Sequence, residues 1–159
     1  MKAGAVDVNS SCRASRHFLT SAAGRRSQQS GANHAPHDLN ITFDCAAAAA
    51  QATFWAAVTG WTASQEDGTP GHAEYCVQPP GGALPRLYFT TVPEPKAAKN
   101  RVHLDLLPPD GEPRDELARL LGLGVVIAGD QPPGASWVIL ADPEGNEFCL
   151  EGGGSQERD

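Results

Sequence analysis

The fold of this chain is decided by a run of six residues, Arg101-Val102-His103-Leu104-Asp105-Leu106. Polar and apolar side chains alternate along the run, and successive side chains of a β-strand point to opposite faces of a sheet. We therefore predict a strand over residues 101–107, with one polar face and one face that enters the core. The run also divides the chain, because the predicted elements before it and after it come in the same order.

The first half begins with another strand in which polar and apolar residues alternate. Its predicted elements are a strand over 39–45, a helix over 46–59 and strands near 61–64, 73–77 and 86–92. The helix is rich in alanine, which favours helical structure, and Gly60 is the residue type that commonly ends a helix. The helical period predicts an apolar face made by Ala50, Phe54, Ala57 and Val58.

The second half repeats this order after a connector whose two prolines exclude a central strand. Its predicted elements are a strand over 101–107, a helix over 112–121 and strands over 125–127, 136–140 and 147–151, with a turn over 142–145 before the last strand. Leu117, Leu120 and Leu121 form the predicted apolar stripe of the helix. An offset of 63 residues aligns Asn40 with His103, and the same offset aligns Phe54 with Leu117. The chain therefore reads as two β-α-β-β-β units in one domain over residues 38–152.

Residues 1–37 differ in composition from this domain. They carry five basic residues and one acidic residue, and no apolar period runs through them. Such a segment buries too little apolar surface to offset the entropy lost on ordering, so we predict a disordered extension. A targeting leader and an incidental extension both fit this composition. Residues 153–159 are predicted to be a flexible tail.

The acidic balance of the chain excludes some classes of partner. The formal net charge is -7 at pH 7, which argues against nucleic acid and anionic membrane surfaces as partners. No run of about 18 apolar residues is present, so no membrane-spanning segment is predicted. The four cysteines, Cys12, Cys45, Cys76 and Cys149, form no C-x-x-C pair. We expect buried thiols, a reducing compartment and a cytoplasmic location.

Three local motifs carry a resemblance to a known family. They are Phe43-Asp44-Cys45-Ala46 followed by Phe54-Trp55 and Gly60-Trp61, the connector from Val92 through Lys96 to Arg101–Leu106, and Ala141–Cys149. With the two β-α-β-β-β units, they resemble the vicinal oxygen chelate (glyoxalase/bleomycin-resistance) superfamily in its glyoxalase-like branch. The resemblance implies an α+β fold whose two βαβββ units form an open, barrel-like cup around a small molecule. It also implies a homodimer.

The same resemblance implies positions for metal ligands. They correspond to Asn40, His103 and Cys149, and to a position near Tyr88, Phe89 and Thr90. Only His103 is a strong metal ligand, so we expect no metal cofactor. Glu147 and Glu151 are the remaining candidates to bind a divalent metal with His103, and solvated carboxylates at the sheet edge are the alternative.

His103 is the predicted catalytic residue. Its imidazole can act as a general base polarised by Asp105, contact a ligand, or only bond its strand neighbours. Arg101 can hold an anionic substrate group or form a salt bridge with Asp105 or Glu94. Other predicted ligand-binding residues are Asn40, Asp105, Cys149 and Trp137.

Two functions follow from these residues and from the resemblance. The first is a glyoxalase-like lyase or isomerase that abstracts a proton from a small polar or carbonyl compound with His103. The second is a non-catalytic protein that binds a drug or metabolite in the cup, as resistance proteins of this superfamily do. In both, the partner is a small molecule.

Overall fold

The structure, a computed structural model, describes residues 38–108, 113–130 and 132–152. The predictions for residues 1–37 and 153–159 therefore lie outside the described residues. The first half contains β1 (Asn40–Cys45), α1 (Ala48–Thr59), β2 (Thr62–Asp67), β3 (Glu74–Gln78), a short 3₁₀ helix (Pro80–Gly82) and β4 (Arg86–Thr91). The second half contains β5 (Asp105–Leu106), α2 (Pro113–Gly122), β6 (Val126–Ile127), β7 (Trp137–Ala141) and β8 (Glu147–Glu151).

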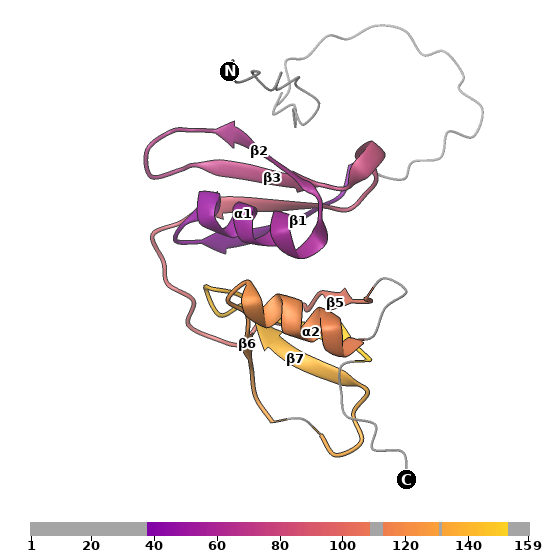
Figure 1. The fold of residues 1–159 in the computed structure, drawn as a ribbon. Helices are drawn as coiled ribbons and strands as arrows, with labels where there is room; N and C mark the ends of the chain where they lie inside the picture. The colour runs from indigo at the N-terminus through magenta and orange to yellow at the C-terminus, as the bar shows by residue number, and fades with distance from the viewer. Residues whose placement is uncertain (1–37, 109–112, 131, 153–159) are drawn as a thin grey trace, which may run out of the picture.

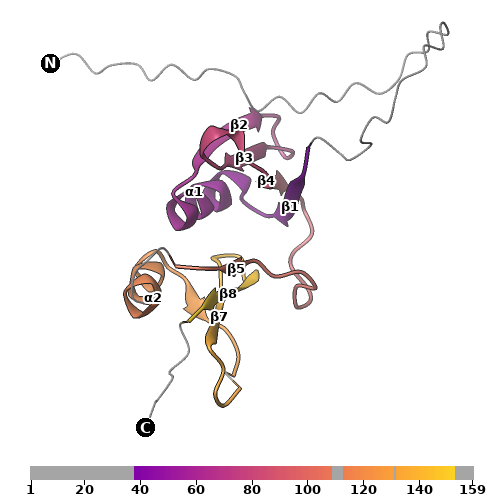
Figure 2. The same cartoon turned by 90° about the vertical axis from the view of Figure 1, so that its right-hand side faces the viewer.

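The two halves have the same sheet topology. The strand order is β1-β4-β3-β2 in the first sheet and β5-β8-β7-β6 in the second. In each sheet the first strand of the half runs parallel to its last strand, and the other neighbours are antiparallel. Both helices lie on the same side of the molecule (Figures 1 and 2). The predicted α+β fold with two βαβββ units is confirmed, and among the described residues the two sheets do not close into a barrel.

Strand β1 follows the predicted alternation. Ile41 and Phe43 pack against the hydrophobic core, whereas Asn40, Thr42 and Asp44 are exposed. The strand pairs with β4 along its whole length, from Asn40 opposite Arg86 to Cys45 opposite Thr91. One edge of β1 therefore has no strand partner among the described residues.

The predicted apolar face of α1 is wrong in part. Phe54 and Val58 are buried, but Ala50 and Ala57 are exposed. The buried side consists of Ala48, Gln51, Ala52, Phe54, Trp55 and Val58. Because alanines lie all around this helix, the sequence period could not locate its inner face. The fully buried indole of Trp55 marks that face in the structure.

Both ends of α1 are capped by side chains of the second half. Glu144 accepts hydrogen bonds from the backbone N–H groups of Ala46 and Ala47, at 2.8 and 2.9 Å. Arg119 of α2 donates to two backbone carbonyls in the last turn of α1, at 3.0 and 2.8 Å. A carboxylate at the N-terminus and a guanidinium at the C-terminus satisfy orphan backbone groups and complement the helix dipole. At the N-terminus the local sequence supplies no side-chain cap, since the residue before the helix is Ala47, whereas at the C-terminus the N–H of Gly60 also bonds the Ala56 carbonyl at 2.8 Å.

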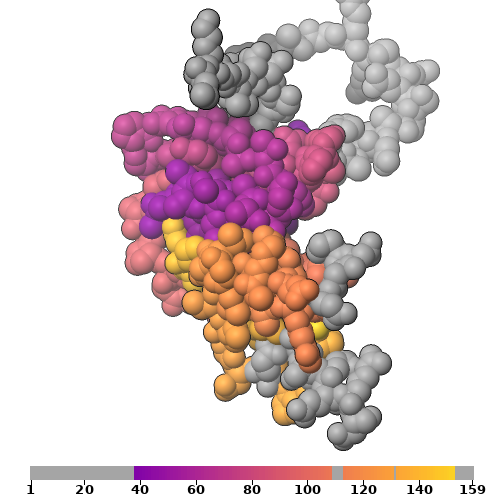
Figure 3. Space-filling view, viewed as in Figure 1, coloured from indigo at the N-terminus to yellow at the C-terminus, as the bar shows by residue number. Residues whose placement is uncertain are grey.

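Trp55 joins the two halves in the core. Its indole Nε1 donates to Asp142 Oδ2 at 3.2 Å, and its ring meets that of Phe148 edge to face at 5.1 Å. Asp142 Oδ1 also accepts from the backbone N–H groups of Glu144 and Asn146. These bonds confirm the predicted turn after β7 and bury a carboxylate with several donors around it. The space-filling view shows the resulting contact between the halves (Figure 3).

The strand predicted over residues 101–107 is much shorter in the structure. Only Asp105–Leu106 form β5, and Val102, which was predicted to face the core, is 72% exposed. Leu104 and Leu106 do pack against the core, and the Leu104 carbonyl accepts from the N–H of Cys149 at 2.9 Å. The residues before Leu104 leave the sheet because they belong to a connector that crosses toward the start of β8.

Helix α2 packs through fewer residues than predicted. Leu120 is fully buried and Leu117 is half-buried, but Leu121 is 42% exposed, so its assignment to the apolar stripe was wrong. Neither α2 nor any other helix of the described ranges is long and apolar enough to cross a membrane.

Some polar groups are buried in the core. Cys45, Cys76 and Cys149 are buried free thiols, as predicted, and Cys12 lies outside the described residues. Burial raises the pKa of the Cys45 thiol to about 11, so the thiol stays protonated. Gln51 of α1 is fully buried, and neither polar atom of its side chain has a hydrogen-bond partner within the described structure.

Candidate functional site

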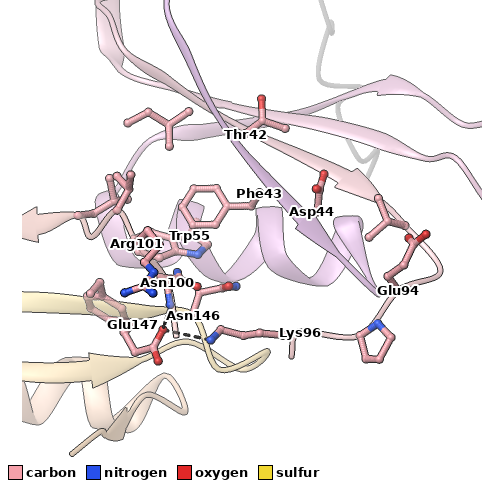
Figure 4. A pocket seen from close by; sticks show the side chains of 16 residues that line it. Thr42, Phe43, Asp44, Trp55, Glu94, Lys96, Asn100, Arg101, Asn146 and Glu147 are labelled. Carbon is pink, nitrogen blue, oxygen red and sulfur yellow. Dashed lines mark hydrogen bonds and ion pairs between the residues drawn. The ribbon is translucent and has the colours of Figure 1, made fainter. Parts of the chain in front are cut away.

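A pocket lies where the free edge of β1 faces the connector between the halves (residues 92–104) and the start of β8 (Figure 4). Its volume is about 710 Å³, which is within the range of small-molecule sites. The connector lies outside the sheet before β5 begins, and its residues form one wall of the pocket.

The floor of the pocket is aromatic. Phe43 stacks on Phe89 with ring centroids 5.1 Å apart and lies tilted to Trp55 at 5.6 Å. Phe148 completes this floor from the second half. Because Trp55 and Phe148 are fully buried, the half-buried Phe43 is the ring that a ligand can reach.

The rim of the pocket is charged, and one ion pair ties the connector to β8. Lys96 Nζ lies 3.2 Å from Glu147 Oε2, and the backbone N–H of Asn100 donates to the same oxygen at 3.0 Å. The Asn100 N–H and, to a lesser degree, Lys96 lower the pKa of Glu147 to about 2. The Glu147 carboxylate therefore stays ionised near neutral pH and holds the connector at two points.

Arg101 and Glu147 are the predicted residues that line this pocket. Arg101 is exposed and forms no ion pair with Asp105, Glu94 or any other residue in the described ranges. Glu147 pairs with Lys96 rather than with His103. The other predicted site residues, His103, Asn40, Asp105, Cys149, Trp137 and Glu151, do not line it.

His103 lies beside the pocket on the same connector. It is half-buried, and its Nε2 lies 2.9 Å from Nζ of Lys99. A lysine ammonium only donates hydrogen bonds, so the ring nitrogen accepts this one. The lone pair that a general base needs is thus engaged by a neighbouring cation.

Asn40 takes part in a bond with a buried cation. Its side-chain oxygen accepts from Nε of Arg86 at 2.9 Å, and Arg86 also lies 3.3 Å from Asp38. Further along the same face, the hydroxyl of Tyr88 donates to Glu74 at 3.0 Å. Burial, and then this bond to Glu74, raises the pKa of Tyr88, so the hydroxyl remains a donor.

Asp105 and Cys149 are paired opposite each other in the β5–β8 ladder. Burial, followed by the charge of Asp105, raises the pKa of the Cys149 thiol. A protonated thiol is a poor nucleophile. Trp137 and Glu151 face each other at the other end of β8 and are half-buried.

Residues 40–151 match the sequence profile of the Glyoxalase-like domain family. The chain belongs to this family. No curated protein matches the sequence at a significant level.

Solved structures share the fold of this glyoxalase-like domain. The fosfomycin resistance protein FosX of Listeria monocytogenes, solved with Mn(II) and 1S,2S-dihydroxypropylphosphonic acid, has a TM-score of 0.56 and 12% identity, covering 78% of this chain and 95% of its own. The trypanothione-dependent glyoxalase I of Leishmania major has a TM-score of 0.55 and 12% identity, covering 75% of this chain and 88% of its own. A member of the glyoxalase/bleomycin resistance protein/dioxygenase superfamily from Sphaerobacter thermophilus has a TM-score of 0.54 and 18% identity, covering 74% of this chain and 97% of its own. At such low identities the likeness concerns the fold alone.

The positions implied for metal ligands do not fit a divalent cation in this glyoxalase-like domain. The oxygen of Asn40 is engaged by the guanidinium of Arg86, and a lysine ammonium lies against His103. The third position is the protonated thiol of Cys149. In the described ranges, no three His, Cys, Asp or Glu side chains form a group that could hold a metal ion. Two positive charges at these positions would repel a metal, so we derive no metal-dependent step.

Several residues of this pocket were not predicted from the sequence. Phe43 was assigned only to the apolar side of a strand, and Lys96 and Asn100 were assigned only to a connector. The signal that could have indicated them is the connector itself, because its prolines keep charged residues on an extended backbone beside a strand edge. The partner of Lys96, Glu147, lies far along the chain and gave no local signal.

Proposed function

We propose that this glyoxalase-like domain binds a small organic molecule in the pocket between β1 and the connector, without a metal ion. The observation that carries this proposal is a pocket of about 710 Å³ with an aromatic floor and a charged rim. Apolar surface in a pocket supplies binding free energy, and a few polar groups fix the orientation of the ligand. The position at the seam of the two halves supports the proposal, since ligand sites favour such clefts.

The state of His103 favours binding over catalysis. Lys99 engages Nε2 of the imidazole, and His103 does not line the pocket. A lyase or isomerase that uses His103 as its base would require Lys99 to move away.

A thermal-shift screen of drug-like and metabolite compounds with the full chain tests the proposal, because a bound ligand raises the melting temperature by mass action. We expect hits whose affinity, measured by calorimetry, falls at least about tenfold in Phe43→Leu. Phe54→Leu is the matched control, since Phe54 is a core phenylalanine that does not line this pocket. Equal affinities in both variants, or a screen without hits, would contradict the proposed site.

The variant His103→Ala separates binding from catalysis. We expect it to retain the affinity of the hits, and we expect the wild type to leave them chemically unchanged during prolonged incubation. Turnover of a hit by the wild type that His103→Ala abolishes would establish the enzymatic alternative. The homodimer expected from the family resemblance stays a prediction that light scattering can test.

A further inference from the structure

Three charged side chains of the pocket have no bonding partner among the residues that the structure describes. Lys96 and Glu147 neutralise each other, but Asp44, Glu94 and Arg101 are exposed and form no hydrogen bond or ion pair within the described part of the chain. All three line the same pocket. They are therefore free to pair with the charges of a ligand.

These free charges are separated by sign. Asp44 and Glu94 lie at one end of the pocket and Arg101 at the other, with the ring of Phe43 between them (Figure 4). The acidic end continues into a smaller hollow of about 340 Å³, which Asp44 and Glu94 also line. Glu144 lines this hollow as well, but its two carboxylate oxygens accept from the backbone N–H groups of Ala46 and Ala47, just before α1.

We infer that the pocket selects a zwitterionic ligand with an apolar body. Its ammonium group would lie between Asp44 and Glu94, its apolar or aromatic body against Phe43, and its carboxylate or similar anion at Arg101. The inference rests on the proposed function and names the class of ligand for the same site. Arginine suits the anionic end because its planar guanidinium binds a carboxylate through two parallel hydrogen bonds.

The pocket should discriminate among ligands because a ligand with a single charge leaves either Arg101 or the two acidic side chains without a counter-charge. A cation without an anionic group would pair with the acids but place its uncharged end against Arg101, and an anion would meet the reverse mismatch. A zwitterion satisfies both ends at once, and complementary charge discriminates among partners more than it adds affinity. Because all three side chains are exposed, each pairing changes affinity only modestly.

Four benzene derivatives of matched shape test the inference. They are 4-(aminomethyl)benzoate, which is zwitterionic, 4-methylbenzylamine, 4-methylbenzoate and the neutral 4-methylbenzyl alcohol. Binding to the full chain is followed by NMR titration at pH 7 and low salt, where screening of exposed charges is weakest. We expect the zwitterion to bind about threefold more tightly than either singly charged compound, and about tenfold more tightly than the alcohol.

Two charge-removing variants assign the ends. We expect Arg101→Gln to abolish the advantage of the zwitterion over 4-methylbenzylamine. The double variant Asp44→Asn with Glu94→Gln should abolish its advantage over 4-methylbenzoate. Arg114→Gln, on the exposed surface of α2, is the matched control and should keep the whole order of affinities.

Failure of this inference can be told apart from failure of the proposed function. Equal affinities for the four compounds, with shifts at Phe43, would overturn the zwitterion while leaving a small-molecule pocket. An order of affinities that Arg101→Gln and Arg114→Gln change equally would also overturn it. In a third outcome, compounds from the thermal-shift screen shift the NMR signals of Phe43 when none of the four benzene derivatives does. That result would overturn the zwitterionic ligand and leave the proposed small-molecule pocket intact. If nothing shifts Phe43, both fail.

Discussion

The two halves of the molecule have the same strand order, but their first strands differ in length. In the first half, β1 has six residues and pairs with β4 throughout, whereas β5 has two. The difference shows that a repeated pattern sets the order of strands, and that tertiary contacts set their length. Where the second half gives up strand pairing, its connector forms the wall of a pocket instead.

The halves also differ in what they contribute to each other. The first half supplies most of the large aromatic residues of the core, including Trp55 and Phe89, and the second half adds Phe148. The second half supplies polar groups that complete the first: Asp142 for the indole of Trp55, and Glu144 and Arg119 for the two ends of α1. Removing these groups one by one tests how far the first half depends on the second.

The largest effect is expected from Asp142→Ala. The change leaves the buried indole N–H of Trp55 and two backbone N–H groups of the turn without an acceptor. We expect a loss of about 3 kcal/mol in the free energy of unfolding, measured by urea denaturation of the full chain. Asp130→Ala, at an exposed position of the same half, is the control. Similar losses in both variants would show that Asp142 does not join the halves.

A smaller effect is expected from Arg119→Met. This variant removes the side chain that bonds the last carbonyls of α1, and it keeps much of the apolar stem. Because the Arg119 side chain is 43% exposed, solvent screens its charge, and we expect a loss of about 1 kcal/mol. Arg114→Met, on the exposed side of the same helix, should change stability by less. An unchanged Arg119→Met protein would show that the cap contributes nothing.

An effect of similar size and opposite sign is expected in the first half. Gln51→Met replaces a buried amide that has no hydrogen-bond partner with an apolar side chain of similar length. We expect the free energy of unfolding to rise by about 1 kcal/mol, since the penalty of burying an unpaired amide disappears. The exposed substitution Ala50→Met controls for helix propensity. A destabilised Gln51→Met protein would mean that the amide has a partner, such as a buried water.

A pH-dependent effect is expected at the ion pair between Lys96 of the connector and Glu147 of β8. The pKa of Glu147 lies near 2 in the folded chain, below its ordinary value of 4.5, so its stabilising contribution is complete above about pH 4.5. This contribution is lost as the pH falls from 4.5 toward 2. We expect Glu147→Gln to be less stable than the wild type at pH 7 and the difference to shrink across that interval. A difference that is constant from pH 7 to 2.5 in urea titrations would contradict this role.

Much of the fold could be predicted from the sequence because it depends on local patterns. The alternation in β1 and the turn chemistry around Asp142 are visible within a few residues. The inner face of α1 could not be predicted, since an alanine-rich helix has little contrast between its sides. The length of β5 could not be predicted either, because Val102 alternates correctly and still has no core to enter.

The candidate site was harder to predict because most of it depends on contacts between residues that are far apart in the sequence. Arg101 was identified as a candidate for an anionic group, and it does line the pocket. Yet the bond from the Asn100 N–H to Glu147 joins residues 47 positions apart, and that between Trp55 and Asp142 joins residues 87 apart. Such pairs become neighbours only after the two halves pack together, so no local pattern indicates them.

The capping of α1 by the second half has a consequence for synthesis on the ribosome. The helix leaves the exit tunnel well before Arg119 and Glu144, so at first the backbone groups that these two side chains bind can bond only to water. An isolated helix of 12 residues is marginal in water, which leaves nascent α1 with little structure of its own. The first half should therefore complete its folding only after Glu144 has emerged, and a ribosome stalled before that point should display it in a protease-sensitive form.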